Sequence, residues 1–185
     1  VDVIKSLKQI EKIKPVSGRL ELVAHLRNNS SIILDFAHTP EALQKSLIEL
    51  KKQFKKKIII VFGCGGERDK AKRYKMGKIA QKYCRKIFVT DDNPRNEKPS
   101  LIRKNILLNC KKGIEIGDRE KAISQAIEDL DIGETLIIAG KGHENIQVNN
   151  NSIKYFNDMK TAEQELKKKY LNEKIKKNII KNFNK

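Results

Sequence analysis

The sequence predicts an α/β domain: a three-layer, Rossmann-like arrangement with a mostly parallel sheet, helices on both faces and a C-terminal β-hairpin. Short apolar runs alternate with helical patterns at the spacing typical of βαβ units. These runs are apolar almost without interruption, as expected for strands that are covered on both faces. No apolar run approaches the roughly 20 residues that a membrane helix requires, and the N-terminal segment lacks a signal-peptide pattern.

The expected strands are five apolar runs. They are SIILDFA (31–37), KIIIVFG (57–63), KIFVT (86–90), GIEI (113–116) and TLIIAG (135–140). The segment IQVNNNSIKYF predicts a hairpin that turns at 149–151.

Start signals predict where the helices begin. Thr39 is an expected N-cap, with Pro40 at the first helical position. Further helices are expected after Pro99, after Asp118 as a cap, and from near Asp158 into the lysine-rich tail. The positions expected to face inward on the first two helices are Leu43, Leu47, Leu50, Met76, Ile79, Ala80 and Tyr83.

Length and composition indicate one globular domain in a reducing compartment. The chain has 185 residues, of which 38% are hydrophobic. Its three cysteines are odd in number and lack metal-ligand spacing, which predicts free thiols in a reducing compartment. Together with the lack of a membrane-length apolar run, this predicts a cytoplasmic protein without a membrane partner. We expect a linker or short helix at 1–14, the domain at 15–170 and a basic tail at 171–185.

The net charge of +17 raises nucleic-acid binding as an alternative. The excess is mainly lysine spread along the chain, and aromatic residues make up only 5%. Arginine forks interleaved with aromatic residues for base stacking are missing. Nucleic acid is therefore not the expected partner.

Four polar or glycine-rich segments each follow an expected strand. They are DFAHTP, FGCGGERDK, TDDNPR and AGKGHE. Ligands of open parallel sheets bind outside the carboxyl ends of the strands. We therefore expect these four segments to meet at one edge of the sheet and to form the functional site.

The segment TDDNPR offers groups of opposite charge in one turn. Pro94 restricts Asn93 to an extended backbone, and Arg95 carries a guanidinium that can hold a carboxylate or phosphate at two points. Such a turn could bind a zwitterion, for instance an amino acid. The alternative is that Asp91 or Asp92 caps the next helix while Arg95 points to solvent.

In the segment FGCGGERDK and directly after it, the glycines are followed by four basic residues, Arg68, Lys70, Lys72 and Arg73. This pattern predicts either an anion site or a flexible turn before a solvated basic helix. It matches neither a P-loop nor a dinucleotide fingerprint. In AGKGHE, Glu144 is suited to accept hydrogen bonds from a cation, and no metal site is expected because His143 has no second ligand at helical spacing.

Six strings, in this order and spacing, resemble the C-terminal domain of the Mur ligases over about residues 1–170. They are SGRLE, DFAHTPEAL, VFGCGGERDKAKR, VTDDNPRNEKP, AGKGHE and FNDMKTAEQEL. GCGGERDK and DDNPR resemble the MurE branch in particular, whereas folylpolyglutamate synthetases share only general features such as D-x-A-H-x-P.

The resemblance implies an ATP-dependent amide ligase of peptidoglycan synthesis. Such a ligase would add meso-2,6-diaminopimelate to UDP-MurNAc-L-Ala-D-Glu through an acyl phosphate. In this family, the arginine of DNPR is associated with diaminopimelate, whose second carboxylate L-lysine lacks. If L-lysine bound instead, the arginine would have no carboxylate partner, and the binding of lysine would be strongly disfavoured.

The resemblance also assigns residues. For diaminopimelate it implies Arg68, Asp92, Asn93, Arg95, Gly140 and Glu144. For ATP it implies Arg19, Asp35 and His38. It implies no catalytic or metal-binding residue in this chain, because the magnesium ligands that accompany ATP belong to a central domain.

The expected partners are diaminopimelate, ATP, UDP-MurNAc-dipeptide, and N-terminal and central domains of the same enzyme, without which this domain should be inactive. One departure is the string Phe-Asn-Asp-Met at 156–159, where the family reads close to Phe-Asp-Asp-Arg. Two alternatives remain: a related ligase that adds L-lysine or another amino acid, and a basic α/β module that binds nucleotides or nucleic acid.

Overall fold

The computed structural model describes residues 16–150 and 152–183, with side chains as far as residue 171. The linker expected at 1–14 lies outside the described residues. Helix α6 continues through most of the expected basic tail.

Six strands form one sheet in the order β1-β2-β6-β3-β4-β5. Their bounds are β1 Glu21–His25, β2 Ser31–Asp35, β3 Ile58–Phe62, β4 Lys86–Val89, β5 Gly113–Glu115 and β6 Thr135–Ala139. Only β1 is antiparallel to its neighbour, and the other pairings are parallel. The mostly parallel sheet is confirmed. Strand β1 was not expected because this edge strand is only partly buried and its sequence, ELVAH, is no apolar run.

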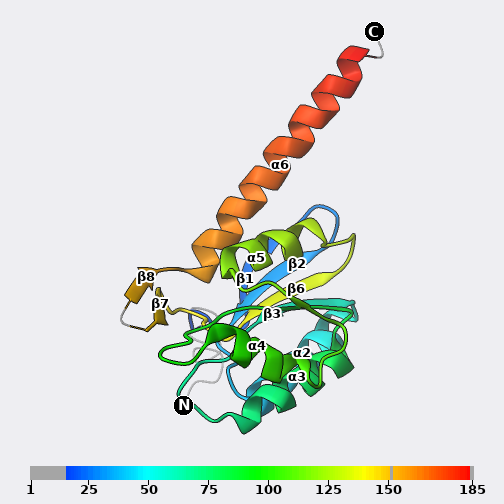
Figure 1. Cartoon of the computed structure of the whole chain (residues 1–185). Coiled ribbons are helices and arrows are strands. Elements are labelled where there is room, and N and C mark those ends of the chain that lie inside the picture. The colour runs from blue at the N-terminus through cyan, green and yellow to red at the C-terminus, as the bar shows by residue number, and fades with distance from the viewer. Residues whose placement is uncertain (1–15, 151, 184–185) are drawn as a thin grey trace, which may run out of the picture.

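Helices cover both faces of the sheet (Figure 1). On one face lie α2 Pro40–Phe54, α3 Ala71–Tyr83 and α4 Pro99–Leu107, and on the other lie α5 Arg119–Glu128 and the start of α6 Asp158–Phe183. Thr39 caps α2 by accepting a hydrogen bond from the backbone N–H of Ala42, as predicted. Asp118 caps α5 in the same way through Lys121.

The core divides into two layers because successive side chains of a strand point to opposite faces. Ile33 packs among the residues of α2, α3 and α4, whereas its neighbours Ile32 and Leu34 pack against α5 and α6. The expected inward residues Leu43, Leu47, Leu50, Met76 and Ala80 are buried, and Ile79 and Tyr83 are partly buried against the same layer.

A separate hairpin is formed by β7 Ile146–Asn149 and β8 Ser152–Tyr155, as expected. It lies beside the loop that follows β4, where the backbone N–H of Arg95 donates to the Val148 carbonyl over 3.1 Å. The N–H of Asn150 donates back to the Arg95 carbonyl over 2.7 Å. Within the described part of the chain, no helix is long and apolar enough to cross a membrane.

Candidate functional site

The loops after β2, β6, β3 and β4 meet at the carboxyl edge of the sheet, as predicted, because these strands are parallel neighbours. Backbone hydrogen bonds join them in pairs. The N–H of Gly140 donates to the backbone carbonyl of Asp35 over 3.0 Å, and the N–H of Gly66 donates to that of Asn93 over 2.9 Å. Residues far apart in the chain therefore share one surface.

Asn93 and Glu144 meet at the centre of this edge. The Asn93 Nδ2 donates to Oε2 of Glu144 over 3.0 Å. Lys141, which is 0% exposed, donates from Nζ to the same oxygen over 3.1 Å and to Oδ1 of Asn93 over 3.2 Å. The site thus holds a carboxylate whose second oxygen, Oε1, accepts no hydrogen bond from a described residue.

Arg95 extends this cluster toward the glycine-rich loop. Its Nη1 donates to the carbonyl of Gly66 over 2.8 Å and to that of Asn93 over 3.3 Å. The expected alternative, in which this side chain points to solvent, is therefore wrong. Its backbone has a φ of +51°, a left-handed conformation that is uncommon outside glycine and is held here by the hairpin.

The glycines of the loop after β3 allow two backbones to approach closely. A Cβ atom on Gly66 would lie 1.9 Å from the Pro94 carbonyl oxygen, and one on Gly63 would lie 2.3 Å from that of Thr90. A Cβ atom on Gly65 would lie 2.9 Å from Nη1 of Arg95. This loop is therefore fitted against the residues after β4, which a merely flexible turn would not require.

Arg73, expected among the solvated cations after this loop, is instead buried. Its Nη2 lies 2.8 Å from Oε1 of Glu97, and its side chain is 1% exposed. The same carboxylate accepts a hydrogen bond from the backbone N–H of Glu67. These donors, the Arg73 guanidinium first, lower the pKa of Glu97 to about 2. The pair joins the two loops and is not available to an anion.

The remaining residues expected for diaminopimelate occupy different depths. Arg68 is exposed, and the stem of its side chain lies near Gly65. Asp92 is 8% exposed, and its carboxylate lies beneath Gly140, where a Cβ atom would be 3.0 Å from Oδ2. Gly140 has a φ of +111°, which favours glycine.

Neither aspartate of TDDNPR caps the following helix, so this alternative is also wrong. The N-cap of α4 is Lys98, which has no side-chain capping hydrogen bond. Asp91 forms an ion pair with Arg103. Burial raises the pKa of Asp91, although Arg103 opposes this effect.

A second group of side chains gathers at the end of β2. The guanidinium of Arg19 lies 5.5 Å from the centre of the Phe36 ring. The rings of His38 and His143 lie 4.6 Å and 5.2 Å from the same ring. Arg19, His38 and His143 are exposed, whereas the Asp35 carboxylate accepts hydrogen bonds from Ser46 and from the backbone N–H of Leu20.

Three features of the site were missed from the sequence. They are the buried Lys141, the ring of Phe36 among Arg19, His38 and His143, and the ion pair of Arg119 with Asp158 beneath the loop after β6. The only sequence signal for Lys141 was its position between two glycines, which is compatible with a solvated lysine too.

The site offers neither a metal cluster nor a reactive thiol in its described part. Among residues 16–150 and 152–171, no three His, Cys, Asp or Glu side chains stand close enough to hold a metal ion. Cys64, within the glycine-rich loop, is 2% exposed, and burial raises its pKa to about 12. The polar groups described at this edge are therefore guanidinium and ammonium groups, imidazole rings, an amide and carboxylates.

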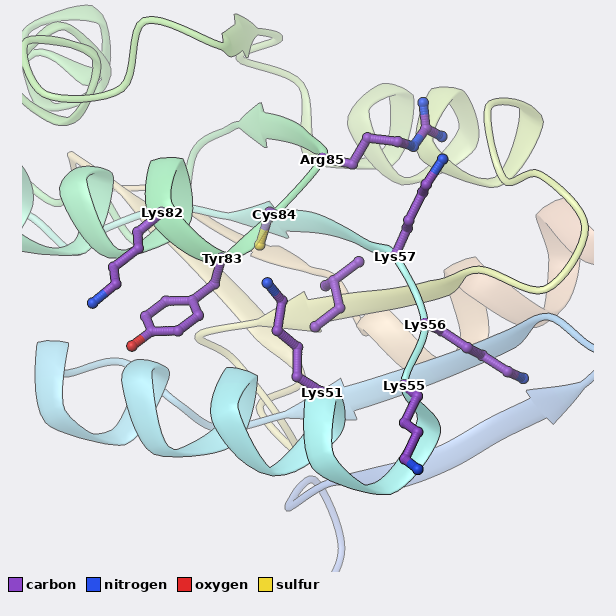
Figure 2. A pocket seen from close by; sticks show the side chains of 9 residues that line it. Lys51, Lys55, Lys56, Lys57, Lys82, Tyr83, Cys84 and Arg85 are labelled. Atoms are coloured by element: carbon purple, nitrogen blue, oxygen red, sulfur yellow. The ribbon is translucent and has the colours of Figure 1, made fainter.

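A hollow of about 570 Å³ lies at the opposite edge of the sheet, before β3 and β4. It is lined mainly by basic residues, namely Lys51, Lys55, Lys56, Lys57, Lys82 and Arg85. Figure 2 shows that the charged ends of Lys55, Lys56 and Lys82 point in different directions, away from those of Lys57 and Arg85. This hollow is therefore not the candidate site.

Comparisons with known proteins place the chain in one family. The family model described as Mur ligase, glutamate ligase domain, matches residues 18–142. The chain is 44% identical over 156 residues to the UDP-N-acetylmuramoyl-L-alanyl-D-glutamate–2,6-diaminopimelate ligase of Mesorhizobium japonicum, covering 84% of this chain and 32% of the relative. It is 48% identical to the ligase of the same name from Rickettsia montanensis, covering 80% and 30%.

Solved structures show the same fold. A structure of UDP-N-acetylmuramoyl-L-alanyl-D-glutamate–2,6-diaminopimelate ligase superimposes with a TM-score of 0.77 and 31% identity, over 92% of this chain and 35% of that one. The chain spans about a third of the length of the curated relatives it matches. By its sequence and its fold, the chain belongs to the Mur ligase family and carries the glutamate ligase domain of that family.

Proposed function

We propose that this chain is the amino-acid-binding domain of an ATP-dependent ligase that adds meso-2,6-diaminopimelate to UDP-MurNAc-L-Ala-D-Glu. The observation that carries the proposal is the cluster of Asn93, Arg95 and Glu144 at one edge of the sheet. The names of the relatives support the choice of substrate.

The free atoms of this cluster suit a zwitterion. Nε and Nη2 of Arg95 bond to no described residue, so this side of the guanidinium can take a carboxylate at two points. One N–H of Asn93 and the exposed Arg68 lie nearby for the same purpose. Oε1 of Glu144 is placed to accept from an ammonium group.

This arrangement favours diaminopimelate over L-lysine. Diaminopimelate carries two carboxylates and two ammonium groups, whereas lysine would leave the free side of Arg95 without an anion. A site built for a polar group rejects the analogue that lacks it far more strongly than an apolar pocket rejects a missing methylene.

Arg19, Phe36 and His38 are the residues that would face ATP. Arg19 lies exposed on the Phe36 ring and can hold a phosphate, and the exposed His38 ring can contact the base or ribose. Bound ATP would supply the phosphoryl group that activates the acceptor carboxylate. Because the described residues contain no cluster suited to Mg²⁺, we assign this chain no step through the metal. UDP-MurNAc-dipeptide and the other ligase domains would be its partners.

Calorimetric titration of the full natural protein with meso-diaminopimelate and L-lysine tests the proposal. We expect diaminopimelate to bind at least about tenfold more tightly, since one charged hydrogen-bonded pair distinguishes the two ligands. Arg95→Ala should abolish this preference, whereas Arg85→Ala, at the opposite edge, should retain it. Equal affinity of the natural protein for both ligands would contradict the proposed substrate.

A further inference from the structure

We infer that Lys141 is a positioning residue, whose buried ammonium fixes the Asn93 amide and the Glu144 carboxylate in the orientation that takes the substrate. The inference deepens the proposed function and rests on it for the identity of the ligand. It begins from an unusual placement: a lysine side chain that is 0% exposed at the edge of a ligand site.

The ammonium of Lys141 has no hydrogen left for a ligand. It donates to Oδ1 of Asn93 over 3.2 Å, to Oε2 of Glu144 over 3.1 Å and to the carbonyl of Ile146 over 2.6 Å. An ammonium group has three N–H donors, and all three are used. Lys141 can therefore influence a substrate only through its neighbours.

Two donors determine which way the Asn93 amide faces. Its Oδ1 accepts from Nζ of Lys141 and from the backbone N–H of Val148, which lies 3.0 Å away. Both groups are donors only, so the amide oxygen must face them. Nδ2 then faces Glu144 with one N–H, and its other N–H donates to no described residue.

The same ammonium orients Glu144. Oε2 receives hydrogen bonds from both Asn93 and Lys141, which leaves Oε1 without a partner among the described residues and free for a ligand. One buried cation thus presets a donor for a carboxylate and an acceptor for an ammonium. Preorganisation of this kind improves binding because the groups need not be ordered when the ligand arrives.

The loop after β6 is shaped to bury this lysine. Gly140 and Gly142, on either side of it, have φ values of +111° and +52°. A Cβ atom on Gly142 would lie 2.8 Å from the Gly18 carbonyl oxygen. The two glycines let the backbone turn sharply around Lys141, so that its side chain points inward.

The variant Lys141→Met removes the charge and keeps a side chain of similar length. In the full natural protein, we expect the KM for meso-diaminopimelate to rise about tenfold or more, from the loss of hydrogen bonds to a charged group. The KM for ATP should change less than about twofold. Lys86→Met is the matched control, because Lys86 pairs with Asp129 at the far edge of the sheet over 2.7 Å.

A double-mutant cycle separates positioning from a general loss of structure. If Lys141 acts through Glu144, Lys141→Met combined with Glu144→Gln should raise KM by much less than the product of the two single effects. If the KM of the double variant instead rises by the product of the two single effects, Lys141 does not act through Glu144.

A measurement without turnover decides the role of Lys141 independently of the substrate. In ¹⁵N-edited spectra, the Asn93 side-chain amide proton that is hydrogen-bonded to Glu144 should exchange slowly in the natural protein and rapidly in Lys141→Met. Lys141→Leu, which also removes the buried donor, replaces that variant if it does not fold. An Asn93 amide that stays protected in the variant overturns the inference, whatever the kinetics show. A natural protein that does not prefer diaminopimelate overturns the proposed function, and the amide measurement still decides the inference.

Discussion

Arg119 and Asp158 face each other in a fully buried ion pair, in which Nε and Nη2 of the guanidinium each donate to a carboxylate oxygen over 2.7 Å. The same Nη2 donates to the carbonyl of Ala139 over 3.0 Å, at the last residue of β6. The pair therefore joins α5 and α6 directly beneath the loop that carries Lys141 and Glu144. It also gives Asp158 a structural role in the string Phe-Asn-Asp-Met.

Removal of one partner of this pair should be strongly destabilising. We expect Asp158→Ala to lower the free energy of unfolding by about 3–5 kcal/mol, because Arg119 would remain buried without its counter-charge. The double variant Arg119→Met, Asp158→Leu should recover most of this loss. Urea denaturation measures both, and Lys168→Ala, which breaks an exposed pair with Glu165, is the control with a far smaller effect. A double variant no more stable than Asp158→Ala would show that the charge is not the cause.

Glu97 should make stability depend on pH in the acid range. Folding lowers its pKa from 4.5 to about 2, mainly through the hydrogen bond from Arg73. Its contribution is therefore complete above the unfolded pKa and is lost as the pH falls toward about 2. The difference in unfolding free energy between the natural protein and Glu97→Gln should shrink across this window.

Arg73→Leu, which removes the cause of the shift, should flatten the same part of the pH profile. Denaturation at a series of pH values between about 5 and 2 measures both variants. A difference that stays constant across the range would contradict the assignment to Glu97.

Gly66 should tolerate no side chain. In Gly66→Ala, a Cβ atom placed 1.9 Å from the Pro94 carbonyl oxygen would force the two loops apart, at a cost of about 1–3 kcal/mol. Gly133→Ala is the control, because Gly133 has open space around it and a φ of +72°. Here only the strained backbone conformation should lower the free energy of unfolding, by about 1 kcal/mol. Equal costs in urea denaturation would argue against the close approach of the loops.

The three cysteines should be unreactive in the folded protein. All are at most 4% exposed, and burial raises the pKa of Cys64 to about 12 and that of Cys110 to about 11. Because only the thiolate reacts readily, dithiobis-nitrobenzoate should label none of them in the native protein at neutral pH and all three in denaturant. Rapid labelling of the native protein would show that one of these thiols is accessible.

The features predicted from the sequence are those determined over short distances along the chain. The cap at Thr39 and the buried face at Leu43 and Leu47 depend on neighbouring residues alone. The meeting of the four loops followed from one general rule about parallel sheets. This is why the position of the candidate site could be predicted together with the fold.

The features that were missed depend on distant partners. Arg73 pairs with Glu97, 24 residues away, and Arg119 pairs with Asp158, 39 residues away. Lys141 is buried because Asn93 approaches it from the loop after β4. From sequence alone, a charged residue is predicted to be exposed to solvent unless its oppositely charged partner is known. Sequence spacing does not reveal a partner that is distant along the chain.

The position of β6 also determines when the site can form. This strand follows five others in the chain, yet it lies between β2 and β3 in the sheet, where Ser31 pairs with Thr135. During synthesis, the early strands therefore emerge without the neighbour that joins them, and contacts of such long sequence separation form slowly. Asn93 can meet Glu144 only once this last central strand has been made and inserted, so the appearance of ligand binding should mark the end of folding.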